Sequence, residues 1–162
     1  MRNLVYLSLG SNLGDREAHL RNAIARLQTR GCVISISSLY ETEPVEFSDQ
    51  GWFLNCAVAL ETTETPQQLM ATILNIEREL GRQRTQKKGP RIIDIDILLF
   101  SDKIIESSQL TVPHPAMHQR RFVLQPLADI APEAWHPQLK KTIRELRDAL
   151  PAGQTVRKHK KD

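Results

Sequence analysis

Two aspartates, Asp94 and Asp96, stand one residue apart in the apolar run between residues 92 and 100. β-Branched and apolar residues dominate this run and Gly89-Pro90 precedes it, which predicts a β-strand. Because side chains alternate along a strand, both carboxylates project to one face, roughly 6–7 Å apart. Two like charges in such a segment are costly unless a cation lies between them. Mg²⁺ prefers hard oxygen ligands and often shares them with substrate phosphates, so the pair is a candidate metal site.

Basic residues come just before this strand, at Arg82, Arg84, Lys87, Lys88 and Arg91. Arginine suits phosphate because its guanidinium presents a fork of hydrogen-bond donors. Carboxylates beside a basic cluster indicate a metal–polyphosphate site. The same pattern also fits a solvent-facing strand whose aspartates pair with surface arginines, because sheets with one wet face are common.

The composition of the chain is that of one soluble globular domain, spanning residues 1–162. Hydrophobic residues make up 40% and charged residues 25% of the sequence, and the net charge is +3. These values are ordinary for a soluble protein of this length. The apolar N-terminus is too short and interrupted for a signal peptide or a membrane span, so a cytoplasmic protein is expected.

Two further expectations concern the cysteines and the C-terminus. Cys32 and Cys56 lie in strand-like runs without a ligand-type spacing, so both are expected to be buried thiols. The basic tail over residues 151–162 is expected to be solvated, because most short basic tails are, although some anchor nucleic acid.

Periodicity predicts strands over residues 4–9, 33–40, 53–60 and 92–100. A helix is expected to follow Asp15 as its N-cap, and a second to follow Thr65, where Gln68 completes a capping box. The order strand-helix-strand-strand-helix-strand is the ferredoxin-like pattern of the α+β class, an antiparallel sheet with both helices on one face. This core would span about residues 2–100. A C-terminal extension over about 101–150 would follow, with a short helix over 142–150.

The strand phases divide the sheet into two faces. In the run 53–60, one set of alternating apolar side chains would meet the helices, and Phe53 and Asn55 would lie on the other face with Ala57 and Ala59. That second face would also carry the two aspartates, which makes it small, polar and acidic and better suited to a ligand than to a core. Phe53 and Phe122 could sandwich a flat heterocycle, worth about 0.5–1.5 kcal/mol each beyond area burial. Asn55 could read the amide edge of such a ring.

Two more residues have a functional and a structural interpretation. Glu77 would lie on the polar side of the second helix, where it could orient a base or a nucleotide, although a solvated helical glutamate is more common. His114 stands between two prolines and precedes Arg120. A lone histidine is more often structural, but this one is a candidate phosphate contact.

Several motifs occur together in a fixed order along the chain: Gly10–Gly14, Tyr40–Pro44, Phe53–Asn55, Gly89–Leu98, and Val112–Pro115 with Arg120 and Phe122. In these motifs and their order, over about residues 2–135, the sequence resembles the 6-hydroxymethyl-7,8-dihydropterin pyrophosphokinases. The resemblance implies transfer of the diphosphate of ATP to the pterin hydroxymethyl group, with release of AMP, in tetrahydrofolate biosynthesis. It implies small-molecule partners only, ATP and the hydroxymethyldihydropterin, with no nucleic acid and no membrane, and a monomer is expected.

The resemblance also implies roles for individual residues. Asp94 and Asp96 would bind two Mg²⁺ ions that bridge the ATP phosphates, and Arg82 and Arg91 would assist catalysis. The pterin would be held by Thr42, Val45, Phe53, Asn55 and Phe122. The ATP site would be lined by Glu77, Arg84, Arg91, Ile97, Thr111, His114 and Arg120.

This sequence departs from the family pattern upstream of the strand, where many members carry a tryptophan. Lys87 and Lys88 stand there instead, and we expect them to contribute charge only. Leu74 and Gln109 replace residues that are polar or basic in some members.

Two other functions fit the same fold class. Ferredoxin-like sheets also form RNA-recognition modules, but Asp94 and Asp96 would repel phosphate in the absence of a metal. A catalytically inactive small-molecule sensor would bind ATP or pterin without producing AMP.

Overall fold

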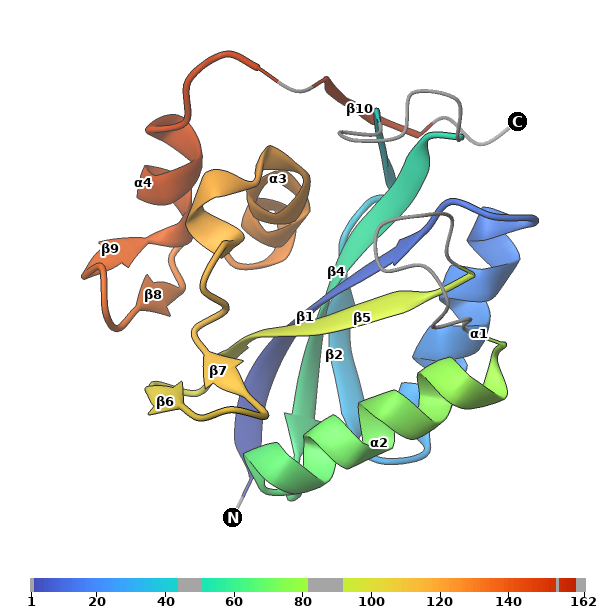
Figure 1. The fold of residues 1–162 in the computed structure, drawn as a ribbon. Coiled ribbons are helices and arrows are strands. Elements are labelled where there is room, and N and C mark those ends of the chain that lie inside the picture. Colours follow the sequence, from blue (N-terminus) through green and yellow to red (C-terminus); the bar gives the residue numbers. More distant parts are fainter. Residues whose placement is uncertain (1, 44–50, 82–91, 154, 160–162) are drawn as a thin grey trace.

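The computed structural model describes residues 2–43, 51–81, 92–153 and 155–159. Within these residues, six strands form one antiparallel sheet, with helices packed on both of its faces (Figure 1). The strand order is β10-β3-β4-β1-β5, and β2 pairs with the other half of β4. The sheet strands are β1 (Asn3–Ser11), β2 (Cys32–Ile36), β3 (Tyr40–Thr42), β4 (Phe53–Thr62), β5 (Asp94–Phe100) and β10 (Val156–Lys158).

The helices and the smaller elements complete the fold. The α-helices are α1 (Arg16–Gln28), α2 (Pro66–Glu79), α3 (Arg121–Ile130) and α4 (Ile143–Asp148). Two short ribbons pair β6 (Ile105–Glu106) with β7 (Thr111–Val112), and β8 (Trp135–His136) with β9 (Lys141–Thr142). A 3₁₀ turn, η1, covers Met117–Gln119. In the described ranges, every helix is too short or too polar to cross a membrane.

The first core lies between the sheet and the pair α1 and α2. Asp15 caps α1 by accepting from the Ala18 N–H at 3.2 Å, and Thr65 with Gln68 forms the expected capping box of α2. The buried side chains of both helices pack against alternate residues of β1, β4 and β5. These residues are Leu20, Ala23, Leu27, Leu69, Ile73, Ile76, Val5, Leu7, Leu9, Leu54, Cys56, Val58, Leu60, Ile95 and Ile97. The predicted helix-facing phase of β4 is therefore confirmed.

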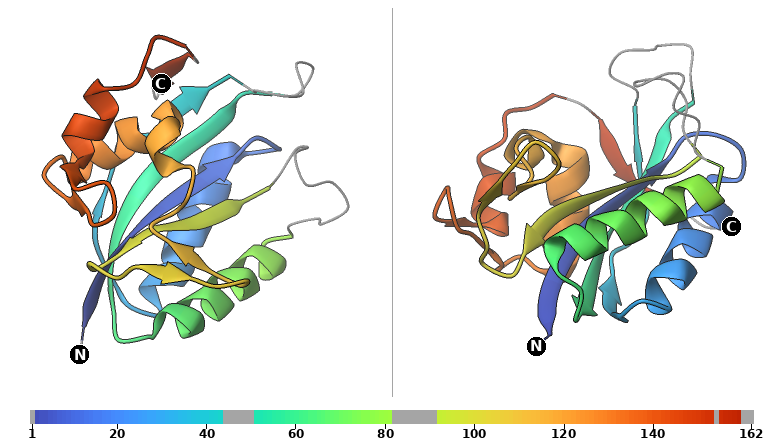
Figure 2. Two further views of the ribbon diagram at one scale, coloured as in Figure 1. Left: turned by 60° about the vertical axis from the view of Figure 1, so that its left-hand side comes forward. Right: turned by 60° about the horizontal axis from the view of Figure 1, so that its bottom comes forward.

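A second core covers part of the face that was expected to suit a ligand more than a core. Helices α3 and α4 pack against Ala57 and the end of β5, and Figure 2 shows them on the side of the sheet away from α1. Leu124 and Leu127 of α3 and Ile143 of α4 are fully buried there. The expectation that this face suits a ligand better than a core is wrong for this half of the sheet, where the C-terminal extension supplies its own apolar layer.

A β-bulge in β5 explains how one strand serves both cores. Leu7 pairs with Ile97 but Tyr6 pairs with Leu99, so Leu98 is an extra residue on β5. The extra residue resets the alternation, so that Leu98 and Leu99 both join the second core while Phe100 joins the first.

Three other expectations are corrected. The strand predicted over 33–40 is divided into β2 and β3, with residues 37–39 between them. Cys32 is exposed, because it lies in an edge strand that pairs only with β4; Cys56 is buried as expected, and burial raises the pKa of its thiol to about 12. The basic tail is not simply solvated, because its residues 156–158 form β10 at the edge of the sheet.

Candidate active site

The open part of the sheet face carries a row of polar groups set by the strand register. Gly10 in β1 lies opposite Asn55 of β4 on one side and opposite Asp94 of β5 on the other. Directly paired residues of neighbouring strands share a face of the sheet. In the next row Ser8 lies opposite Asp96. The prediction that both aspartates share a face with Asn55 is thus confirmed, and small residues of β1 separate them.

The Asn55 side chain is held in one orientation. Its Nδ2 donates to the Thr42 hydroxyl at 2.9 Å, and both residues are buried. Its Oδ1 lies above Gly10, where a Cβ atom would come within 2.6 Å of it. A carboxamide fixed in this way presents a donor and an acceptor side by side, which matches the edge of an amide-type heterocycle.

Phe53 belongs to β4 of the sheet, and Phe122 belongs to α3, which packs on the sheet face that carries Asn55. Phe53 pairs with Thr42, and its Cδ1 would lie 3.7 Å from a Cβ on Gly10. Phe122 lies in the first turn of α3, which covers this face. It is half-buried there, and the Arg120 guanidinium lies 5.5 Å from its ring centroid.

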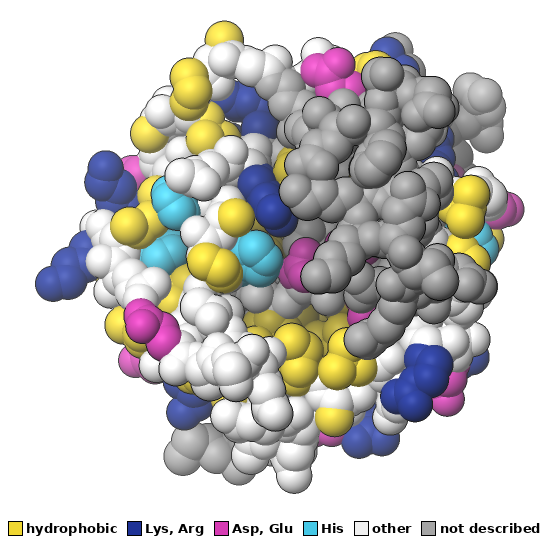
Figure 3. Space-filling view, viewed as in Figure 1, with side chains coloured by type: hydrophobic (Ala, Val, Ile, Leu, Met, Phe, Trp, Pro, Cys, Tyr) yellow, Lys and Arg dark blue, Asp and Glu magenta, His cyan; other side chains and the backbone are white. Residues whose placement is uncertain are grey.

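A cavity of about 300 Å³ opens next to this row, between α2, β5 and the segment that leads to η1. Figure 3 shows this side of the molecule, where a hollow with hydrophobic side chains lies beside acidic and histidine side chains. Residues predicted for metal and for ATP line it together. The lining residues are Met70, Ile73, Leu74, Glu77, Asp94, Ile95, Asp96, His114 and Arg120.

The sequence suggested that Glu77 would lie on a solvated helix face, but the structure buries it. It is 2% exposed, and its Oε2 accepts from the Ile95 N–H at 2.8 Å. β5 is an edge strand, so this backbone donor faces away from β1. Helix α2 packs along that edge, which buries the glutamate and lets it satisfy the donor.

His114 is anchored to the same edge. Its main-chain N–H donates to the Leu98 carbonyl at 3.0 Å, and its ring Nδ1 accepts from the Ala116 main-chain N–H at 3.1 Å. A neutral ring that accepts at Nδ1 carries its proton on Nε2. Burial lowers the pKa of His114, the nearby Arg120 lowers it further, and Asp94 acts in the opposite direction. The ring is therefore a neutral Nε2–H donor at pH 7.

The remaining predicted residues are placed differently. The Ile97 side chain lies in the first core, so a contact with a nucleotide would come through its main chain. Thr111 is half-buried in β7, where it pairs with Glu106. The predicted residues Val45, Arg82, Arg84 and Arg91, and the two lysines Lys87 and Lys88, lie outside the described residues.

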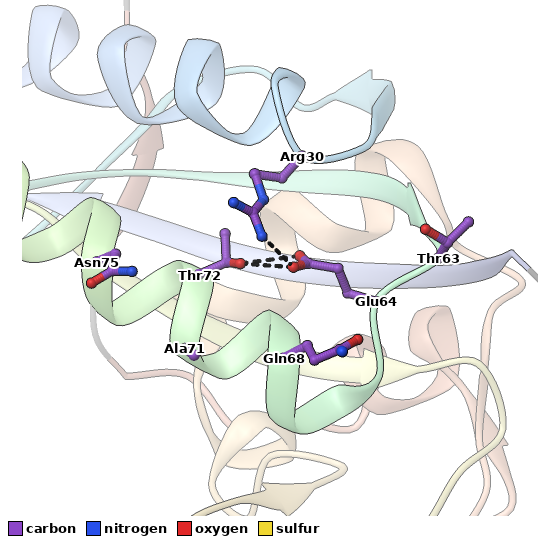
Figure 4. A pocket seen from close by; sticks show the side chains of 7 residues that line it. All are labelled: Arg30, Thr63, Glu64, Gln68, Ala71, Thr72 and Asn75. Atoms are coloured by element: carbon purple, nitrogen blue, oxygen red, sulfur yellow. Dashed lines mark hydrogen bonds and ion pairs between the residues drawn. The ribbon is translucent and has the colours of Figure 1, made fainter.

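A second cavity, of about 410 Å³, lies at the start of α2 (Figure 4). Its charged groups are matched internally, because Glu64 accepts from Arg30 at 2.9 Å and from the Thr72 hydroxyl at 2.9 Å. We assign no ligand to it.

Comparison with known proteins identifies the family. The family model described as 7,8-dihydro-6-hydroxymethylpterin-pyrophosphokinase (HPPK) matches residues 6–132. The chain belongs to this family. It is 51% identical over 132 residues to the 2-amino-4-hydroxy-6-hydroxymethyldihydropteridine pyrophosphokinase of Bacillus subtilis (strain 168), covering 80% of this chain and 79% of that protein.

Longer proteins contain a similar segment. The folic acid synthesis protein FOL1 of Dictyostelium discoideum is 42% identical over 154 residues, which cover 95% of this chain but 23% of that protein. The crystal structure of Plasmodium falciparum HPPK-DHPS wild type with pterin and p-hydroxybenzoate superposes with a TM-score of 0.73 at 20% identity, covering 91% of this chain and 42% of that one. At that identity the likeness concerns the fold.

The donor set of this HPPK-family site fits Mg²⁺. The described residues hold no group of three or more His, Cys, Asp or Glu side chains that could cage a metal. Mg²⁺ is usually bound through one or two carboxylates and completes its shell with water and substrate phosphates. Asp94 and Asp96 beside a cavity that also holds Arg120 and His114 supply that kind of site.

Gly10 is the site residue that motif reasoning missed. Its role follows from the Asn55 carboxamide oxygen, which lies only 2.6 Å from the position that a Cβ on Gly10 would occupy. A glycine inside a strand often marks such an approach, and this was the available signal.

Proposed function

We propose that this chain catalyses the Mg²⁺-dependent transfer of diphosphate from ATP to the hydroxymethyl oxygen of 6-hydroxymethyl-7,8-dihydropterin. In this reaction the hydroxyl oxygen bonds to the β-phosphorus, the bridge between the α- and β-phosphates breaks, and AMP and a proton leave. One observation carries the proposal. The row Asn55–Gly10–Asp94 joins an amide-reading side chain to the paired carboxylates on one sheet face.

We assign the pterin to the Asn55 end of this row. Asn55, oriented by Thr42, would bond the amide edge of the ring. Phe53 and Phe122 would stack on the two ring faces, an arrangement supported by their positions on β4 and on the covering helix. Val45 is assigned to the same site from the family resemblance alone.

We assign ATP to the adjacent cavity, with two Mg²⁺ ions held by Asp94 and Asp96. When bound, such ions neutralise phosphate charge and align an in-line displacement. The neutral His114 would donate from Nε2 to a phosphate oxygen, and Arg120 would add positive charge; the cavity that both residues line supports these roles. Arg82, Arg84 and Arg91 complete the phosphate contacts by resemblance, and Glu77, Ile97 and Thr111 complete the walls.

No side chain needs to act as a covalent nucleophile in this proposal. Rate enhancement would come from holding the hydroxymethyl oxygen and the β-phosphorus in line, in a site whose charges are already arranged. Ion pairs and hydrogen bonds that fix the strands therefore contribute to catalysis indirectly.

We also infer that residues 2–100 form a ferredoxin-like unit within a single domain. The spatial order β5-β1-β4-β2, with α1 and α2 on one face, supports this inference. Residues 101–150 would form the extension that covers the other face, and the protein would act as a cytoplasmic monomer.

The test is an assay of the purified protein with ATP, Mg²⁺ and 6-hydroxymethyl-7,8-dihydropterin, in which AMP and ADP are both quantified. We expect AMP from the wild type. Asp94→Asn and Asp96→Asn should each lower turnover by more than about 100-fold, the upper end of the loss seen when an outer-shell partner of a metal is removed.

The matched control is Asp102→Asn, because Asp102 is an exposed aspartate just beyond the end of β5. It should turn over at the wild-type rate. Wild-type turnover in the Asp94→Asn/Asp96→Asn double variant would refute the metal assignment. Binding of a non-hydrolysable ATP analogue without any AMP production would instead identify an inactive sensor.

A further inference from the structure

The C-terminal tail is bonded to the strand that carries part of the pterin site. In β10, Val156 pairs with Thr42, Arg157 with Glu41, and Lys158 with Tyr40. Bonds continue beyond both ends of the pairing. The Thr155 N–H donates to the Glu43 side chain at 2.8 Å, and the His159 N–H donates to the Leu39 carbonyl at 2.8 Å.

β3 depends on this support because it is only three residues long. One of its edges pairs with β4 and the other pairs with β10. It carries Thr42, whose hydroxyl accepts from Asn55 at 2.9 Å. The position of the Asn55 carboxamide therefore depends on where β3 lies.

Arg157 contacts both Trp52, the residue before Phe53, and Glu41 in β3. Its guanidinium lies 4.3 Å from the Trp52 ring centroid, and its Nε lies 3.8 Å from Glu41 Oε1. Arg16 contacts the same two residues, because it donates to the Trp52 carbonyl at 2.8 Å and to Glu41 Oε2 at 3.1 Å. Trp52 and β3 are thus tied together from the C-terminal tail and from the start of α1.

The Glu41 carboxylate contacts both arginines. Burial acts to raise the pKa of Glu41, but the hydrogen bond from Arg16 and the adjacent His159 ring outweigh burial and lower the pKa. Glu41 is therefore ionised at neutral pH and can hold both arginines. It pairs with Leu54 across β3 and β4, so its side chain points to the face of the sheet opposite the pterin row.

We propose that Arg157 is a positioning residue for the pterin. By contacting Trp52 and Glu41 on the face of the sheet opposite the pterin row, it fixes the positions of Phe53 and Thr42, whose side chains lie on the pterin face. Arg157 would not touch the substrate, because its contacts lie on the other face. Phe53 follows Trp52 directly, and Thr42 follows Glu41 directly, so each anchored residue is one peptide away from a pterin-binding side chain. This inference rests on the pterin assignment proposed above.

The test compares Arg157→Ala, Arg157→Lys and Lys158→Ala. Lys158 is the matched control, since it lies in the same strand with the same charge and the same exposed class but pairs with Tyr40 instead of Glu41. Equilibrium binding of 6-hydroxymethylpterin would be measured with Mg²⁺ and a non-hydrolysable ATP analogue, together with the KM of each substrate and kcat.

We expect Arg157→Ala to weaken pterin binding and raise the pterin KM by about 5-fold, the upper end of what an exposed cation–π contact is worth. The KM for ATP should stay within about 2-fold. Arg157→Lys should recover most of the loss, because an ammonium also binds an aromatic face. Lys158→Ala should match the wild type. In a Trp52→Leu background, Arg157→Ala should add little, since its aromatic partner is gone.

Unchanged pterin binding in Arg157→Ala would overturn the proposal. So would equal weakening of both substrates together with a lower melting temperature, because a merely structural role predicts that pattern. Direct binding keeps this test separate from the proposed reaction: a wild type that binds pterin but makes no AMP would refute the reaction and leave the role of Arg157 measurable.

Discussion

The most specific prediction concerns a single added methyl group, Gly10→Ala. The new Cβ would lie 2.6 Å from Asn55 Oδ1, which is 0.8 Å inside the 3.4 Å where ordinary contact begins. The nearest atom belongs to the end of a side chain, so the carboxamide can move and the strand can stay. A shift of that size takes the 2.9 Å bond to Thr42 outside the usual 2.7–3.2 Å range unless Thr42 follows.

The expected effect is on pterin recognition. Asn55 can make two hydrogen bonds to an amide edge, each worth a net 0.5–1.5 kcal/mol, so misplacing the carboxamide should cost about 1–3 kcal/mol, or about 5- to 150-fold in affinity. The loss of unfolding free energy should stay below about 1.5 kcal/mol, because the alanine preference over glycine in a strand, about 0.5–1 kcal/mol, offsets part of the weakened Asn55–Thr42 bond.

A double-mutant cycle tests this reasoning with Asn55→Ala. Pterin binding would be titrated for Gly10→Ala, Asn55→Ala and the double variant, with binding of an ATP analogue as the control. If Gly10 acts through Asn55, adding Gly10→Ala to Asn55→Ala should cost less than about 0.5 kcal/mol. Fully additive losses, or wild-type pterin affinity in Gly10→Ala, would show that Gly10 does not act through Asn55.

Three further predictions concern stability, each measured by urea unfolding. Tyr40→Phe should lower the unfolding free energy by about 1 kcal/mol, because the Tyr40 hydroxyl donates to both oxygens of Asp129 at 2.8 and 2.9 Å; no further loss is expected when Asp129→Ala is added. Glu77→Ala should cost about 1–3 kcal/mol by leaving the buried Ile95 N–H without this acceptor, and Glu77→Gln should recover most of it; equal losses would contradict that explanation. Burial lowers the pKa of His136 below its ordinary 6.5, so between the two pKa values the unfolded state binds more protons than the folded state. The contribution of His136 to the unfolding free energy is therefore complete above pH 6.5 and is lost as the pH falls from 6.5 through the folded pKa. His136→Gln should make the unfolding free energy less dependent on pH in this range, and an unchanged dependence would contradict this explanation.

Alternation alone was enough to predict that Asn55, Asp94 and Asp96 share one face of the sheet. The phases of β1, β4 and β5 placed Asn55 and the two aspartates on one face, and the structure agrees. Local capping signals also held, since Asp15 and Thr65 both cap helices as their sequences indicate. Alternation within a strand and helix capping both depend on residues close together in the chain, which a sequence displays directly.

The features that were missed depend on partners distant in sequence. Leu98, Leu99 and Phe100 are all apolar, so nothing in their order signals the bulge that divides them between two cores. Glu77 is buried because α2 packs along the unpaired edge of β5, and helical periodicity cannot anticipate that edge. The tail strand likewise exists because β3 offers an edge, which its basic composition concealed.

The same applies to the helix α3. Pro126 lies inside it, and a proline within an apolar segment argues against a helix when local propensity is considered alone. Tertiary packing of Val123, Leu124 and Leu127 against the sheet outweighs that local penalty. The second core, and with it the limit of the open ligand face, therefore required the structure.

The proposed reaction transfers a diphosphate and not a single phosphate. This can be followed by ³¹P NMR of the wild-type reaction with ATP, Mg²⁺ and 6-hydroxymethyl-7,8-dihydropterin. We expect two coupled phosphorus signals of a pterin diphosphate ester, growing in step with AMP. ADP with a pterin monophosphate, or ATP that remains intact, would contradict it.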